Sequence, residues 1–159
     1  NDSDANIAVS EFDNILLLDV LEHVEDPEAF VFRLRITAKG KNPKFIVSVP
    51  NVAFFVVRIQ LLFGNFNYGI RGTLDLGHRR LFTFGSIRQL FLQAGYRIQT
   101  IKGIPAPFPL AIGENWLSRC LLTINQMLIK LFPRLFAYQI ILIASPSPTL
   151  DDLWDKNRT

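Results

Sequence analysis

The sequence predicts an α/β fold built on a strand–helix–strand unit. Two apolar runs, at 14–18 and 45–49, have the length and composition of strands that are buried on both faces of a parallel sheet. Between them lies a helix start signal, Asp26-Pro27-Glu28. Because two parallel strands must be joined by a long crossover, a βαβ unit is the economical arrangement.

Length and composition limit the classes of protein that this chain can represent. Its 159 residues suit one domain, and 49% apolar against 19% charged residues exclude disorder for most of the chain. The single cysteine, Cys120, excludes an internal disulfide framework and a cysteine-rich zinc site, which favours a reducing, cytoplasmic compartment. The net charge is +3, and the lysine and arginine residues are scattered along the sequence, so we expect no nucleic-acid partner. We also expect neither a signal peptide nor a membrane-spanning helix.

The remaining elements follow from helix signals and apolar spacing. Thr83 has the chemistry of a helix N-cap, and Gly95 can end the helix that begins there. Apolar residues recur at helical spacing from Leu117 to Leu131, and Pro133 is expected to end that helix. In order, the expected elements are a loop at 1–11, a strand at 14–18, a helix at 27–38, a strand at 45–49, a helix at 52–63, a Gly-rich loop at 64–77, a helix at 83–94, a strand at 96–102, a Pro-rich loop at 104–115, a helix at 117–131, a strand at 136–144 and a polar tail from Ser145.

Acidic and imidazole side chains follow the first strand directly. Asp19, Glu22 and His23 lie at the expected carboxyl edge of the sheet, where ligands bind in open α/β folds. The carboxylates could bind a cationic or polyhydroxyl ligand, and His23 could act as a general base near neutral pH. The alternative is that Asp19 caps the turn while Glu22 and His23 lie on a solvated helical turn.

A second polar group ends the Gly-rich loop. His78 could act as a base, and the guanidinium groups of Arg79 and Arg80 match an anionic substrate. The alternative is an exposed basic loop. The spacing of His23 and His78 along the sequence does not match a metal site, so no metal is expected.

Three further features have a structural and a functional interpretation. Tyr68, in the Gly-rich loop, could line a substrate pocket or cover the core. The segment 117–132 is amphipathic and carries Arg119 and Lys130, so it could rest on a membrane surface. Packing on the sheet is favoured, because a strand follows at once. Cys120 is expected to be a buried structural thiol.

Three motifs, in this order, resemble the class I S-adenosylmethionine-dependent methyltransferases. Residues 12–27, which include Asp19-Val20-Leu21-Glu22-His23, are similar to the stretch around the fourth strand of that family. Residues 45–51 resemble the fifth strand, and residues 74–83 with Ala94-Gly95-Tyr96 resemble the later part. The strongest likeness is to the ubiquinone-biosynthesis and methionine-biosynthesis-W type subfamily.

The resemblance implies a Rossmann-like sheet of order 3-2-1-4-5-7-6 with the seventh strand antiparallel. The chain would supply strands four to seven with their flanking helices over residues 1–145, followed by a polar tail at 146–159. The family's first strand, Gly-rich cofactor loop and ribose-binding acid have no counterpart here, so the chain is expected to be the C-terminal part of a longer enzyme. Its first strand would then be an unpaired edge with apolar surface open to water.

The resemblance also implies a reaction, namely methyl transfer from S-adenosylmethionine to a small-molecule acceptor. His23 would face the methyl group, and His78 would be a second catalytic residue in contact with the substrate. The residues implied in cofactor binding are Asp4 and Ala5 at the adenine and Asp19, Leu21 and Glu22 at the methionine end; those implied in substrate binding are Asn51, Tyr68, Asp75 and Arg80.

A second function stays open. The missing cofactor loop, the basic pI of about 9.3 and the apolar C-terminal helix favour a non-catalytic interaction or membrane-surface domain derived from the same fold. Besides the methyl acceptor, the expected partners are therefore a missing N-terminal half of the domain or a second copy of the chain. Peripheral membrane contact is a further expectation.

Overall fold

Four strands form one sheet in the computed structural model, which describes residues 12–38, 42–70 and 72–148. They are β1 (Asn14–Leu18), β2 (Lys44–Pro50), β3 (Tyr96–Ile104) and β4 (Gln139–Pro146), in the spatial order β1-β2-β4-β3. β1 and β2 run parallel, whereas β4 is antiparallel to both β2 and β3. The α/β class and the antiparallel last strand are therefore confirmed for the described residues.

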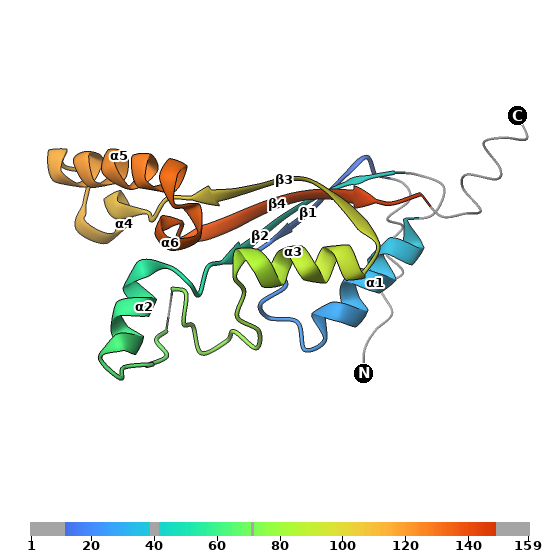
Figure 1. Cartoon of the computed structure of the whole chain (residues 1–159), viewed down its shortest axis with the longest axis horizontal. Helices are drawn as coiled ribbons and strands as arrows, with labels where there is room; N and C mark the ends of the chain where they lie inside the picture. The colour runs from blue at the N-terminus through green and yellow to red at the C-terminus, as the bar shows by residue number, and fades with distance from the viewer. Residues whose placement is uncertain (1–11, 39–41, 71, 149–159) are drawn as a thin grey trace, which may run out of the picture.

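The helices divide into two groups. α1 (Pro27–Thr37) and α3 (Phe84–Gln93) lie on one face of the sheet (Figure 1). Their caps are the predicted ones, since Asp26 Oδ1 accepts from Ala29 N at 2.8 Å and Thr83 Oγ1 accepts from Ser86 N at 3.2 Å. The second group gathers at the end of the sheet where β2 and β3 finish (Figure 1): α2 (Phe55–Leu62), α4 (Phe108–Ile112), α5 (Trp116–Leu131) and α6 (Pro133–Phe136).

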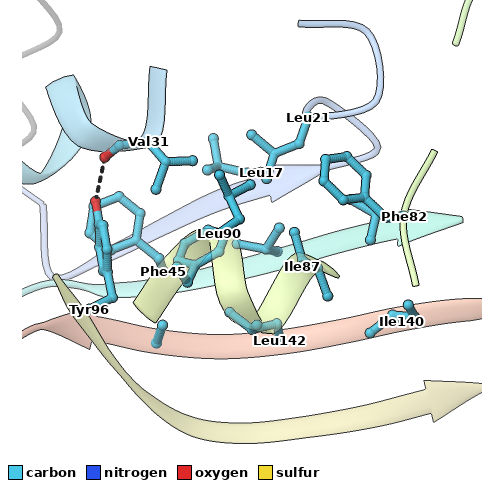
Figure 2. Close-up of a cluster of buried hydrophobic side chains, with 14 of the residues drawn as sticks. Leu17, Leu21, Val31, Phe45, Phe82, Ile87, Leu90, Tyr96, Ile140 and Leu142 are labelled. Atoms are coloured by element: carbon cyan, nitrogen blue, oxygen red, sulfur yellow. Dashed lines mark hydrogen bonds between the residues drawn. The ribbon is translucent and has the colours of Figure 1, made fainter. Parts of the chain in front are cut away.

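The core lies between α1, α3 and the sheet (Figure 2). Phe45 and Phe91 meet the ring of Tyr96 edge-on, each with 5.1 Å between ring centroids. The Tyr96 hydroxyl donates to Val31 O at 3.1 Å, so the one polar tip in this aromatic group has a partner. Other fully buried members are Leu21, Val47, Ile87, Ile140 and Leu142.

β1 differs from the prediction of a strand buried on both faces. Leu17 points into the core, but Leu16 is 59% and Leu18 is 53% exposed. Both side chains lie on the face of the sheet opposite α1 and α3, together with half-buried Ile46 and Ile143. Within the described ranges β1 pairs with β2 alone, so the expectation of an edge strand with open apolar surface is confirmed there.

Three expectations for the C-terminal part are wrong. The 104–115 segment contains the short helix α4 instead of being a loop throughout. The last strand begins at Gln139 and not at residue 136, because α6 occupies that position. Pro133 does follow the end of α5, as expected, and it also begins α6, because proline fits the first position of a helix. β4 continues to Pro146, so the polar tail does not start at Ser145. Ser145 is buried, and its hydroxyl accepts from Gln99 Nε2 at 3.1 Å. The later part of the expected tail, 149–159, lies outside the described residues.

Candidate functional site

The site begins where β1 ends, at Asp19. The backbone φ of Asp19 is +52°, in the left-handed region that aspartate tolerates better than most residues. Its N–H donates to Ser48 O at 3.1 Å, and its Oδ1 accepts from Ser48 Oγ at 2.9 Å. Gln139 Nε2 donates to both carboxylate oxygens, at 3.0 and 3.1 Å. Residues of β2 and β4 therefore hold the carboxylate of Asp19 at the edge of the sheet.

Backbone hydrogen bonds then join the turn after Asp19 to the segment before α3. The amides of Arg79 and Arg80 donate to Glu22 O at 2.7 and 3.0 Å. Their approach places the ring of His78 beside that of His23, with 5.0 Å between the ring centroids. Residues that are distant along the sequence are thus brought to one point at the carboxyl end of β1.

Both imidazoles are oriented by backbone carbonyls. His23 Nδ1 lies 3.0 Å from Gly77 O, and His78 Nδ1 lies 3.1 Å from Thr73 O. Because a carbonyl oxygen only accepts, each ring donates from Nδ1. The Nε2 atom of each neutral ring then keeps its lone pair, which can accept a proton or bind a metal ion.

The Glu22 side chain is the unusual member of the site. Glu22 is only 1% exposed, and neither of its carboxylate oxygens makes a hydrogen bond. Burial raises the pKa of this carboxyl above its ordinary value; the nearby backbone N–H of Glu22 itself lowers it, Asp19 raises it, and the two imidazoles lower it. The alternative that Glu22 lies on a solvated turn is wrong. A buried carboxyl without a partner calls for a proton or a cation.

Glu22, His23 and His78 together form what we call the Glu22 cluster. One carboxylate oxygen and one nitrogen from each ring lie within 4.8 Å of one another. Two imidazoles and a carboxylate are a ligand set that divalent transition metals accept, and metal-bound histidines commonly donate their other N–H to a carbonyl, as both do here. The expectation that no metal binds rested on the spacing of His23 and His78 along the sequence. Because the fold brings the two rings together, that spacing no longer argues against a metal site.

Asn51, an expected substrate contact, has its polar atoms engaged inside the protein. Its side chain is buried, and Nδ2 donates to Ala137 O at 2.8 Å and to Arg134 O at 3.3 Å. Its Oδ1 accepts from Ala53 N at 3.1 Å. This geometry gives Asn51 a structural role in joining β2 to the α6–β4 connection, and its contact with a substrate stays a prediction.

The other predicted residues divide between the edge of the cluster and places away from it. Asp75 Oδ1 accepts from Gly77 N at 2.7 Å and so shapes the turn that presents Gly77 O to His23. Arg80 instead forms an ion pair with Glu28 of α1 at 2.6 Å.

Two more of the predicted residues that the structure describes, Leu21 and Tyr68, are not in the cluster either. The Leu21 side chain is part of the hydrophobic core, and a contact of this residue with the cofactor stays a prediction. Tyr68 is exposed and meets Phe66 edge-on. Asp4 and Ala5 lie outside the described residues.

Sequence reasoning missed Thr73, Tyr138 and Gln139 as members of this site. Gln139 is 120 residues from Asp19, and only the pairing of β4 beside β2 brings them together. Burial raises the pKa of the Tyr138 hydroxyl, a hydrogen bond with Thr73 lowers it, and Asp19 raises it. A polar residue at the start of a strand was the only available signal for Gln139.

No protein-family model matches the sequence, and no curated protein matches it. Among solved structures, the chain is similar to an S-adenosylmethionine-dependent methyltransferase from Archaeoglobus fulgidus, with a TM-score of 0.51 and 19% identity over 90% of this chain and 65% of that one. It is also similar to the small RNA methyltransferase HEN1, with a TM-score of 0.51 and 19% identity over 86% of this chain and 14% of that one. The chain thus spans less than two thirds of the length of either protein. At this identity the likeness concerns the fold, and the chain has the α/β fold of S-adenosylmethionine-dependent methyltransferases.

Proposed function

We propose that this chain is the C-terminal portion of an S-adenosylmethionine-dependent methyltransferase that acts on a small-molecule acceptor. The observation that carries the proposal is the Glu22 cluster. In a chain with a methyltransferase-like fold, it lies at the carboxyl end of β1, where open α/β sheets bind their ligands.

Three observations support the assignment of residues 1–145 to the later part of the domain. The order β1-β2-β4-β3 agrees with positions 4-5-7-6 of the sheet that the sequence resemblance implies. The free edge of β1 and the exposed Leu16 and Leu18 are suited to a further strand and further helices. The two solved neighbours are also longer than this chain. The Gly-rich cofactor loop would come from polypeptide outside these 159 residues or from a second copy.

The chemistry required of these side chains is positioning and proton removal. S-adenosylmethionine, when bound, would supply a methyl group activated by its sulfonium, and transfer of that methyl to the acceptor would leave a neutral thioether. A hydroxyl acceptor must lose its proton, which the Nε2 lone pair of His23 or His78 can take. Asp19 and Glu22 are proposed to contact the methionine end of the cofactor, and the remaining catalytic effect is alignment of the two reactants.

The Glu22 cluster also fits a divalent cation, because its buried carboxylate oxygens have no other partner. Glu22, His23 and His78 would hold the ion, which would lower the pKa of an acceptor hydroxyl bound to it. In that arrangement the imidazoles position the acceptor and do not accept its proton.

Cation binding can be tested without any activity. Thermal unfolding of the chain with Mn²⁺, against the same sample with EDTA, should show stabilisation by the cation. The shift should disappear in Glu22→Gln and persist in Glu25→Gln, whose side chain is exposed beside Arg79. If no cation stabilises the chain, the general-base role of the histidines is the one that remains.

The methyltransferase proposal is tested by calorimetric titration of S-adenosylmethionine into this chain and into the product of the whole reading frame. In the whole product, His23→Ala should lower turnover about 10²–10⁴-fold and leave the cofactor Kd nearly unchanged. Arg88→Gln, exposed on α3, is the matched control. Equal losses of turnover and cofactor affinity in His23→Ala would contradict a role at the methyl group.

A non-catalytic interaction domain is the second candidate function. The specific observation in its favour is the set of exposed apolar side chains on α5. If the whole gene product binds no S-adenosylmethionine, this second candidate replaces the first.

A further inference from the structure

Helix α5 presents one stripe of apolar side chains to solvent, while others such as Ile129 are half-buried. Trp116, Cys120, Ile124, Met127 and Leu131 recur every three or four residues and therefore share one face, which we call the α5 apolar stripe. All five are exposed, with Trp116 at 79% and Leu131 at 70%. The prediction that Cys120 is buried is thus wrong. The buried residues of this helix are polar, namely Ser118 and Asn125.

Hydrogen bonds fix this orientation of α5. Asn125 Oδ1 accepts from Ala106 N at 3.1 Å, and Asn125 Nδ2 donates to Phe136 O at 3.0 Å. At the helix start, Ser118 and Asn115 form a reciprocal capping pair, with Ser118 N donating to Asn115 Oδ1 at 2.8 Å. Rotating α5 to bury its stripe would leave buried backbone groups without partners, so the stripe is held outward.

Basic side chains flank the stripe. Arg119 and Lys130 are exposed on the adjacent side of α5, and Arg134 follows in α6. α4, α5 and α6 contain no acidic residue. From residue 76 to residue 148 the chain has one acid, Glu114, and eight bases: Arg79, Arg80, Arg88, Arg97, Lys102, Arg119, Lys130 and Arg134.

We propose that α5 docks this protein on the surface of an anionic phospholipid bilayer. An apolar stripe beside lysine and arginine is the pattern of a helix that lies in the membrane interface. Trp116 at the start of the stripe and Phe132 just after α5 are exposed aromatic residues of the kind that sits at headgroup level. No helix in the described ranges is long and apolar enough to cross a bilayer.

The basic side chains beside the α5 apolar stripe favour an anionic lipid surface over a second copy of the chain as the partner. Two copies meeting through their stripes would bring Arg119 and Lys130 of each toward the same bases of the other, and Glu114 is the one acid near the stripe that could oppose them. An anionic surface attracts these same side chains. The α5 end is also where β2 and β3 finish, so docking there would bring the site end of the sheet toward the lipid (Figure 1). The inference does not depend on methyl transfer.

The test is co-sedimentation of the full chain with phosphatidylcholine vesicles, with and without phosphatidylglycerol. We expect binding to the anionic vesicles only. The double variant Met127→Ser with Leu131→Ser should bind the anionic vesicles about tenfold more weakly or worse. The double variant Arg119→Gln with Lys130→Gln should show a similar loss of binding. Ile36→Ser removes an exposed apolar side chain from α1 and should leave binding unchanged.

A spectroscopic readout places the contact on α5. The chain has two tryptophans, and Trp154→Phe leaves Trp116 as the sole one. Its emission should shift to shorter wavelength with anionic vesicles and stay unchanged with neutral ones. Sedimentation without this shift, no sedimentation at all, or a dimer in solution that the stripe variants abolish would each overturn the proposal. Far-ultraviolet circular dichroism should show each variant folded, since the side chains replaced on α1 and α5 are exposed.

Discussion

The two ends of this molecule differ in the kind of side chain that they bury. Between α1, α3 and the sheet, apolar side chains such as Phe45 are buried and the one polar tip, that of Tyr96, is hydrogen-bonded (Figure 2). On α5 the buried side chains are Ser118 and Asn125, the apolar stripe faces outward, and leucines such as Leu121 are only half-buried. The first region is held by hydrophobic burial, whereas the second is held by directional hydrogen bonds that leave an apolar surface available for a partner.

The largest expected effect is that of truncating the core. Phe45→Ala removes a fully buried ring that packs on Tyr96, so we expect a loss of about 3–5 kcal/mol in the free energy of unfolding. Leu131→Ser on α5 should change it by no more than about 0.5 kcal/mol, because this side chain is already exposed. Urea denaturation measures both, and similar losses in the two variants would erase the contrast between the regions.

Asn125→Ala tests whether α5 is held by hydrogen bonds. The substitution leaves Ala106 N–H and Phe136 C=O without their partner, so we expect a loss of about 2–3 kcal/mol. Gln126→Ala, on the exposed side of the same helix, is the control and should be nearly neutral. A neutral Asn125→Ala would show that packing, and not these two bonds, holds α5.

Tyr96→Phe sharpens the description of the core. The ring packing is kept, but Val31 O loses its donor, so a loss of about 1 kcal/mol is expected. Tyr68→Phe, which changes an exposed hydroxyl, should have no measurable effect on thermal unfolding. A gain in stability on Tyr96→Phe would mean that the buried hydroxyl is worse than none.

Glu22→Gln should give a small gain in stability, and the size of this gain depends on pH. The folded-state pKa of Glu22 is raised above the ordinary value of 4.5, so folding favours the protonated form. At a pH below the ordinary pKa, Glu22 is protonated in both the folded and the unfolded state, so its ionisation does not lower the stability. As pH rises through the raised pKa, the wild type loses stability that the Gln variant keeps. Melting temperatures of the two proteins, without added metal, should diverge toward neutral pH and converge in acid; a constant difference would contradict the raised pKa.

Much of the fold was predictable because its signals are local. The apolar run of β1, the Asp26 cap of α1 and the Thr83 cap of α3 each involve neighbouring residues, and their bounds follow from backbone chemistry. The short helix α4 was missed because three prolines in that segment predict a loop. The exposure of Leu16 and Leu18 could be predicted only from the resemblance to the methyltransferase family, because an apolar run does not indicate which part of the protein covers it.

The sequence by itself determined which side chains follow β1, because Asp19, Glu22 and His23 are joined to it by a short stretch of chain. Only the tertiary structure decided that Glu22 is buried without a partner, that His78 meets His23, and that Gln139 holds Asp19. It also decided which side of α5 faces solvent. Helical spacing shows that two faces differ, but the hydrogen bonds of Asn125 to distant backbone groups choose between them.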